Sequence, residues 1–102
     1  MEISTYPDGD GQVVKVVGDL TSQQPLARLP STVRRIVDSE APTDLKVNVR
    51  DVELIDLEGI ASLIEARKVA LERGARFALV DGQPRVRHRL EVTGLLDLLE
   101  GR

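Results

Sequence analysis

Two carboxylates at the start of a predicted helix, Asp56 and Glu58, have the residue types and spacing closest to those of a chemical site. Such a pair can act as a general acid and a general base, or it can hold a metal ion. Side chains two residues apart point in different directions on a helix, however, and no histidine lies near them in the sequence. A catalytic or metal site needs converging groups, so we predict neither at this position.

Other residues capable of chemistry are few. The single histidine, His88, lies in the basic segment Arg85–Arg89. This segment could contact an acidic partner or a phosphate group, but a solvated helix face is the simpler interpretation. The run Asp8–Gly11 alternates acid and glycine as a calcium loop does, yet the other ligand positions are missing and a turn is expected. The chain has no cysteine, nucleophile–base pair or phosphate-binding glycine loop, so we expect no enzyme, no cofactor and no metal.

The composition is that of one ordinary globular domain covering residues 1–102. The net charge of −3 argues against a general nucleic-acid binder, which would usually be basic. The apolar runs are far shorter than the roughly 20 residues of a membrane span, and no basic-then-apolar leader is visible. We therefore expect a cytoplasmic protein with no direct nucleic-acid contact and no membrane insertion. The oligomeric state stays open.

The N-terminal part of the chain predicts a β-hairpin. Two runs of strand-forming residues, Glu2–Tyr6 and Gln12–Val17, flank residues 7–11, where proline and glycine favour a turn. The first strand would lie at the edge of a sheet.

A helix is predicted next, from apolar residues at helical spacing. Thr21 or Ser22 could cap its start. The helix begins either near Pro25, with a kink, or near Pro30, since proline is tolerated only in a first turn. It ends before Pro42, because the residue before proline disfavours helix. Its apolar residues are Leu29, Val33, Ile36 and Val37.

The rest of the chain alternates strands and helices. A strand over residues 45–49 precedes a helix that Asp56 caps and Gly74 stops, and a second strand covers residues 77–80. Pro84 opens another helix, and residues 95–99 form a last apolar turn. The apolar residues of the two helices are Ile60, Leu63, Ile64, Ala70 and Leu71 in the first, and Val86, Leu90 and Val92 in the second. This β-β-α-β-α-β-α order predicts an α/β fold with a mainly parallel sheet, an antiparallel edge hairpin and helices mostly on one face.

The segment Val47–Leu63 joins a buried strand, a short polar turn and a helix that opens with Asp-Leu-Glu-Gly. It resembles the central motif of the STAS family, the anti-sigma factor antagonists, in which an apolar strand and Asp-Ser-Ser-Gly or Asp-Thr-Ser-Gly precede an amphipathic helix. In that family the first hydroxyl residue of the motif is the phosphorylation switch. Leu57 occupies that position here, and no Ser, Thr or Tyr lies between Thr43 and Ser62. The resemblance therefore implies a family member without the usual switch.

Shorter motifs extend the resemblance over nearly the whole chain. Gly18–Thr21 matches the Gly-Glu-Leu-Asp-like turn of the family, and Phe77–Val80 matches the strand after its central helix. Leu90–Leu95 matches the Leu-x-x-Thr-Gly-Leu end of a proline-initiated helix. Thr21 is a second departure, because the family often has an aspartate there, near the switch loop.

The resemblance implies a binding protein. An anti-sigma factor antagonist binds a serine-kinase-type anti-sigma factor and releases its sigma factor, and phosphorylation of the switch adds about two negative charges that break the contact. Because Leu57 cannot accept phosphate, we expect constitutive binding, or control by expression or another ligand. Two alternatives remain open. One is an accessory subunit of a lipid-type ABC transporter, docked on its nucleotide-binding subunit, and the other is a scaffold component of a stress-signalling complex.

The resemblance also locates the partner-binding surface, at the start of the central helix. Glu58 is either a phosphate mimic or, as we prefer, an ordinary first-turn carboxylate favoured by the helix dipole. Leu57 is either an anchor for a partner or a side chain packed back on Ile60 or Ala61. Gly59 is expected to permit a close backbone approach. The predicted partner-binding residues are Thr21, Asp56, Leu57, Glu58, Gly59 and Ser62.

Overall fold

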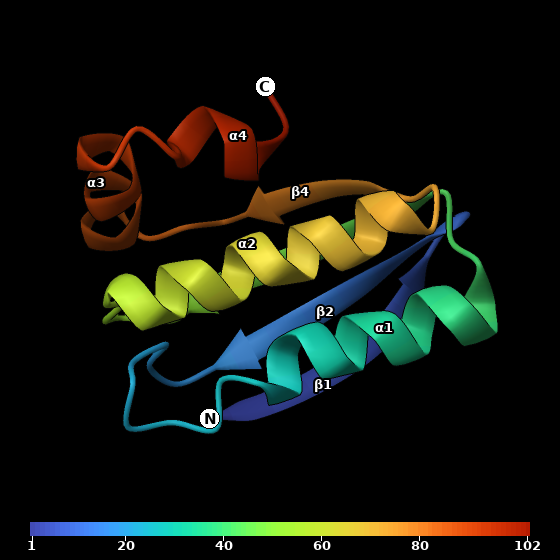
Figure 1. Cartoon of the computed structure of the whole chain (residues 1–102), viewed down its shortest axis with the longest axis horizontal. Helices are drawn as coiled ribbons and strands as arrows, with labels where there is room; N and C mark the ends of the chain where they lie inside the picture. Colours follow the sequence, from blue (N-terminus) through green and yellow to red (C-terminus); the bar gives the residue numbers. More distant parts are fainter.

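The computed structural model describes all 102 residues, as one four-stranded sheet with four helices (Figure 1). The strands are β1 (Glu2–Asp8), β2 (Gly11–Val17), β3 (Asp44–Asp51) and β4 (Arg76–Val80). The helices are α1 (Arg28–Glu40), α2 (Leu57–Glu72), α3 (Pro84–Val92) and α4 (Leu96–Glu100). In the sheet order β1-β2-β3-β4, β1 pairs antiparallel with β2, while β2 with β3 and β3 with β4 pair parallel. The predicted α/β fold is confirmed.

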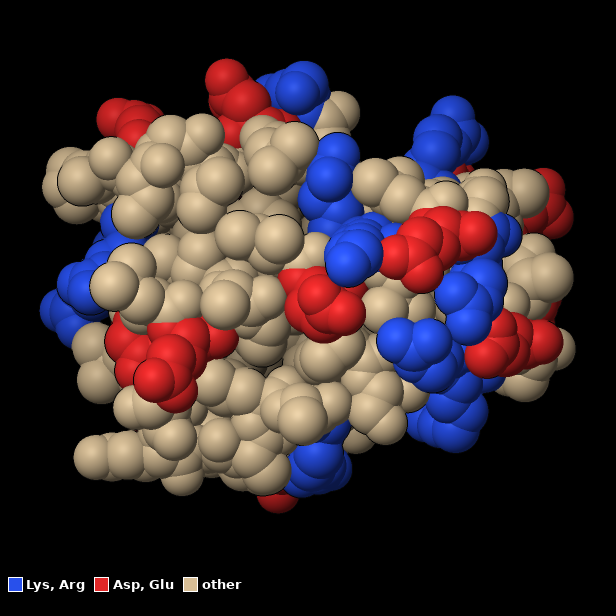
Figure 2. Space-filling view, viewed as in Figure 1, with Lys and Arg blue, Asp and Glu red and all other residues tan.

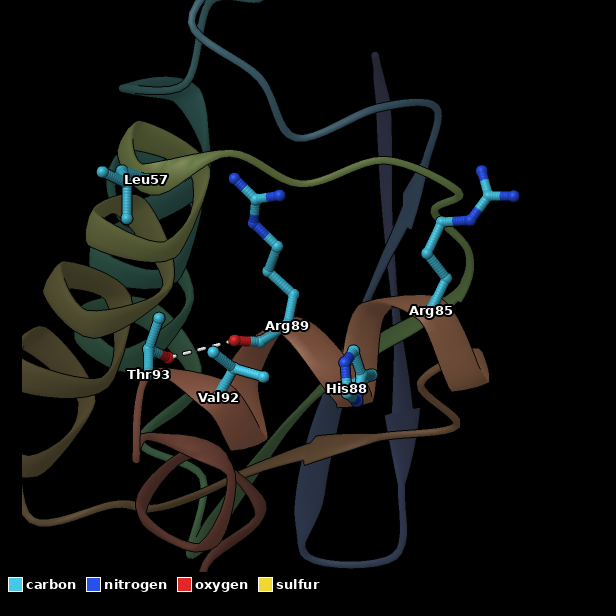
Figure 3. Close-up of a pocket in the computed structure, with 6 residues that line it drawn as sticks. All are labelled: Leu57, Arg85, His88, Arg89, Val92 and Thr93. Carbon is cyan, nitrogen blue, oxygen red and sulfur yellow. Dashed lines mark hydrogen bonds between the residues drawn. The ribbon is translucent and has the colours of Figure 1, made fainter.

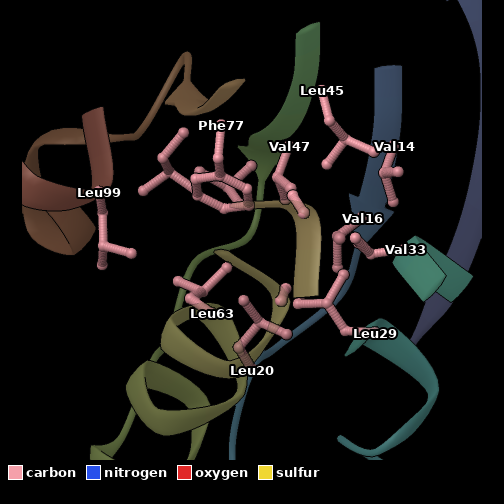
Figure 4. Close-up of a cluster of buried hydrophobic side chains, with 14 of the residues drawn as sticks. Val14, Val16, Leu20, Leu29, Val33, Leu45, Val47, Leu63, Phe77 and Leu99 are labelled. Atoms are coloured by element: carbon pink, nitrogen blue, oxygen red, sulfur yellow. The ribbon is translucent and has the colours of Figure 1, made fainter. Parts of the chain in front are cut away.

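The hydrophobic core fills the space between one face of the sheet and the helices. α1 and α2 lie side by side across that face, α4 lies beside β4, and α3 lies beyond the end of β4 and contacts α4 (Figure 1). The core side chains are mostly aliphatic, and burial of each Leu or Val stabilises the fold by roughly 1.5–3 kcal/mol relative to exposure. Figure 4 labels ten of them, Val14, Val16, Leu20, Leu29, Val33, Leu45, Val47, Leu63, Phe77 and Leu99. None of the helices combines the length and the apolar character needed to cross a membrane.

The β1–β2 hairpin is tighter than predicted. β1 continues through Pro7 to Asp8, which pairs with Gly11, so only Gly9 and Asp10 form the turn. Gly9 has a positive φ of 61°, which glycine adopts without strain. Pro7 is tolerated within β1 because an edge strand does not need every N–H for pairing.

The start of α1 corrects one prediction. Neither Thr21 nor Ser22 caps this helix; its N-cap is Ala27, which makes no side-chain cap bond. The chain first follows the segment before α2 and turns again, so the helix begins at Arg28 and Pro30 lies in its first turn. The four apolar residues predicted for this helix are all buried, as expected. The helix ends before Pro42, as predicted.

The predicted stop of α2 at Gly74 is confirmed. Gly74 has a φ of 82°, and its N–H donates to the Leu71 carbonyl at 3.0 Å, while the Ala75 N–H donates to the Ala70 carbonyl at 3.0 Å. This pair of bonds is the Schellman arrangement, which satisfies carbonyls at a helix end. Leu71 itself is exposed, as is Val92 in α3, so both lie off the core faces to which the apolar pattern assigned them.

An ion pair joins α3 to α4. The Arg87 guanidinium donates from Nε to Glu100 Oε2 at 2.8 Å and from Nη2 to Oε1 at 3.1 Å. The Glu100 side chain is only 9% exposed, and Arg102 also contacts it at 2.8 Å. The hydrogen bonds from Arg87 outweigh burial and hold the pKa of the Glu100 carboxyl below its ordinary value of 4.5. This pairing fixes the short C-terminal helix against α3.

Candidate functional site

The site is built where the loop after β2 runs beside the segment that enters α2. The Leu20 N–H donates to the Leu54 carbonyl at 2.9 Å, and the Asp56 N–H donates to the Leu20 carbonyl at 3.1 Å. These bonds make a short parallel bridge between Leu20 and Ile55. They bring Thr21, which is partly buried, next to the start of α2, so the two sequence-distant parts of the predicted surface do meet.

Asp56 joins the two segments through its carboxylate. Oδ1 accepts a hydrogen bond from the Gly59 N–H at 2.8 Å, which confirms Asp56 as the N-cap of α2. Oδ2 accepts one from the Ser22 N–H, also at 2.8 Å. The N–H groups of Ser22 and then Gly59 hold the pKa of the Asp56 carboxyl below its ordinary value of 3.8. Both oxygens are therefore engaged in holding the turn.

Gly59 and Ser62 lie beneath the predicted surface. A Cβ on Gly59 would lie 1.9 Å from the Leu20 carbonyl oxygen, so the close approach expected of this glycine is made to the protein's own loop. Ser62 is buried, and its hydroxyl donates to the Gly59 carbonyl at 2.7 Å. These two residues shape the start of the helix from below and present no side chain to solvent.

Leu57 is the first residue of α2 and is 68% exposed. Glu58 follows it in the first turn and is also exposed, where the partial positive charge of the helix start favours a carboxylate. A Leu57 side chain packed on Ile60 or Ala61 would be far better covered, so its exposure argues against that packing. The turn thus holds an apolar side chain outward on a well-fixed backbone.

A groove beside Leu57 brings in residues that the sequence analysis did not assign to the site. It has a volume of about 480 Å³ and runs between the start of α2 and the face of α3 (Figure 3). Its lining consists of Leu57, Arg85, His88, Arg89, Val92 and Thr93. The Thr93 hydroxyl donates to the Leu90 carbonyl at 2.9 Å and to the Arg89 carbonyl at 3.2 Å, and so is occupied at the helix end. The sequence does show that Arg85, Arg89 and Val92 recur at helical spacing and so share one face of α3. It does not show that this face lies beside Leu57.

Comparison with known proteins gives the family. The family model described as Mlab, STAS domain matches residues 4–100 of the chain. The chain belongs to the STAS domain family. The resemblance seen in the central motif is therefore confirmed. No curated protein sequence matches this STAS domain.

Solved structures share the fold of this STAS domain. The unphosphorylated anti-sigma factor antagonist SpoIIAA is 16% identical over 93% of this chain and 83% of its own, with a TM-score of 0.76. A sulfate transporter family protein from Wolinella succinogenes is 19% identical over 92% of this chain and 75% of its own, with a TM-score of 0.72. SpoIIAA in its phosphorylated form, a Bacillus cell fate determinant, is 15% identical over 92% of this chain and 85% of its own, with a TM-score of 0.67. At these identities the likeness establishes the fold.

Proposed function

We propose that this STAS domain acts by binding and not by catalysis, as an anti-sigma factor antagonist. It binds a serine-kinase-type anti-sigma factor and so releases the sigma factor. The observation that carries the proposal is Leu57, an exposed apolar side chain at the start of α2, on a turn that Asp56 fixes with two hydrogen bonds. The shared fold with SpoIIAA supports the same assignment.

Control of this binding does not use phosphate at the usual position, because Leu57 has no hydroxyl group. Ser62, the next hydroxyl along α2, is buried and bonded to the Gly59 carbonyl, which makes it a poor kinase substrate. After incubation of the domain with the cognate anti-sigma kinase and ATP, intact-protein mass spectrometry should show no added phosphate. Stoichiometric phosphate on residues 54–62 would refute this part of the proposal.

The direct test is isothermal titration of the purified anti-sigma factor with three forms of the domain. Wild type should bind, and Leu57→Glu should bind at least about tenfold more weakly, since the substitution puts a charge in the centre of an apolar contact. Leu71→Glu is the matched control, because Leu71 is an exposed leucine at the far end of the same helix. It should keep the wild-type affinity.

Two outcomes would contradict the proposal in different ways. Equal affinities for wild type and Leu57→Glu would place the interface elsewhere on the domain. No binding by wild type to any serine-kinase-type anti-sigma factor of the same cell would remove the antagonist role itself.

A second candidate is an accessory subunit of a lipid-type ABC transporter, docked on the nucleotide-binding subunit. The likeness to a sulfate transporter family protein favours keeping this candidate, since it links the same fold to transport proteins. Co-purification with a transporter ATPase, together with no affinity for an anti-sigma factor, would select it. The same Leu57→Glu and Leu71→Glu pair would then test whether the ATPase uses the same surface.

A further inference from the structure

The groove between α2 and α3 gathers the two most exposed large apolar side chains of the chain. Val92 is 72% exposed and Leu57 is 68% exposed, and both line the same hollow although they come from different helices. A single exposed apolar residue is ordinary, but two that face one groove form a surface whose burial by a partner is favourable. The groove volume of about 480 Å³ suits a few side chains of an inserted segment.

The charge of the groove has one sign. Arg85 and Arg89 are exposed, one helical turn apart on α3, and their side chains extend from the same side of the helix (Figure 3). Neither forms an ion pair within the chain, and the third titratable group of the lining is His88. No carboxylate lines the groove. An occupant would therefore gain by bringing negative charge to α3.

The surface around the groove is consistent with a contact that is partly apolar and partly charged. Figure 2 shows a largely uncharged surface over α3, α4 and the first half of α2, with basic side chains at its left edge and acidic ones at its upper edge and near the start of α2. Charged side chains are denser toward the opposite end of the molecule (Figure 2). A small inorganic anion such as phosphate would leave Leu57 and Val92 uncovered, whereas a protein segment with aliphatic side chains can cover them.

We propose that this groove binds an acidic segment of the partner protein that carries exposed aliphatic side chains. The aliphatic groups lie between Leu57 and Val92, and the carboxylates pair with Arg85 and Arg89. This inference rests on the proposed function only in taking the partner to be a protein that docks at the start of α2. It names the chemistry that such a partner must offer there.

The test uses NMR of the ¹⁵N-labelled domain with defined probes. The first probe is an acidic peptide, a short synthetic peptide with leucine and glutamate at helical spacing. The control peptide has lysine in place of each glutamate. ATP and inorganic phosphate are the small-anion probes. The acidic peptide alone should shift the amides of Leu57 and of α3. The affinity should fall at least about tenfold in the double variant Arg85→Glu/Arg89→Glu and fall with added salt, since the contact includes charge.

The matched control is Arg34→Glu/Arg35→Glu, which makes the same change of charge at exposed positions of α1. It should bind the acidic peptide almost as wild type does. Circular dichroism should show both double variants folded, because all four arginines are exposed. Val92→Ser should weaken binding without changing the charge.

Several results would overturn the inference. One is that the acidic peptide shifts no amide resonance of the groove. Another is that the lysine peptide, ATP or phosphate shifts these resonances equally. A third is that both double variants lose affinity for the acidic peptide equally. The titration with the anti-sigma factor separates this inference from the proposed function. If wild type and Arg85→Glu/Arg89→Glu bind that factor equally, the groove chemistry is wrong and the antagonist role stands. If the acidic peptide binds the groove and no anti-sigma factor binds, the role is wrong and the groove chemistry stands.

Discussion

Neighbouring residues at the turn into α2 have separate tasks. Asp56 and Gly59 hold the backbone, one by accepting two N–H bonds and the other by leaving room for the Leu20 carbonyl. Leu57 and Glu58 between them face solvent. The residues that hold the turn and the residues that we propose for recognition are therefore different side chains within a single helical turn.

Gly59→Ala should destabilise the domain strongly. The added methyl would meet the Leu20 carbonyl oxygen at 1.9 Å, so the loop or the helix must move. Overpacking of this kind costs about 1–3 kcal/mol, occasionally more, which lowers Tm by roughly 5–20 °C in a domain of this size. Thermal unfolding measures it. Leu57→Ala in the same turn is the control and should change the free energy of unfolding by less than about 0.5 kcal/mol. Equal stability of Gly59→Ala and wild type would contradict the packing described for this site.

At the scale of elements, local patterns account for most of the secondary structure. The Asp56 cap, the Gly74 stop and the apolar spacing of α1 are signals contained within one segment, and all three were predictable. The loop after β2 was not, because its course is decided by bonds to Leu54 and Asp56, far away in the sequence. A serine that looks like a helix cap instead gives its backbone N–H to another segment.

The α3–α4 ion pair predicts a pH-dependent contribution to stability. Hydrogen bonds from Arg87 lower the pKa of the Glu100 carboxyl in the folded state, so the pair stabilises the fold above the unfolded value of about 4.5 and is lost as pH falls through the folded pKa. Glu100→Gln should lower Tm by several degrees at pH 7, and the difference from wild type should shrink below about pH 4.5. Glu65→Gln, a change at an exposed position of α2 that forms no ion pair, is the control and should show neither effect. A Tm difference that stays constant from pH 7 to pH 3 would argue against the pair.

At the scale of the whole molecule, one face of the sheet carries the helices and the other carries ion pairs between strands. Lys46 contacts Asp8 at 3.1 Å and Arg76 contacts Asp44, so charged side chains satisfy one another across the open face. The alternation of apolar and polar residues along β3 predicts this two-sided character. The alternation cannot predict how the helices are placed beside one another, so only the structure shows that Val92 and Leu57 line the same groove.

The sheet order predicts how the fold opens. β3 pairs with a strand on each side, β2 and β4, while β1 pairs with β2 only. In native-state hydrogen exchange, the amides of Val47 and Val49 should be among the slowest, with protection close to that of global unfolding. Bonded amides of β1 should exchange at least about tenfold faster, since an edge strand can detach locally. Equal protection of β1 and β3 would mean that the sheet opens only as a unit.

The exposure of Leu57 has an evolutionary consequence. Because its side chain adds little to the core, its chemistry can change in one substitution without loss of foldability. Asp56 and Gly59 have no such freedom, since each is required by the backbone around it. A lineage of these domains can therefore lose or regain a modifiable hydroxyl at this position while it keeps the frame that displays it. Selection on the proposed regulatory position can therefore act separately from selection on folding, although the residues concerned are neighbours.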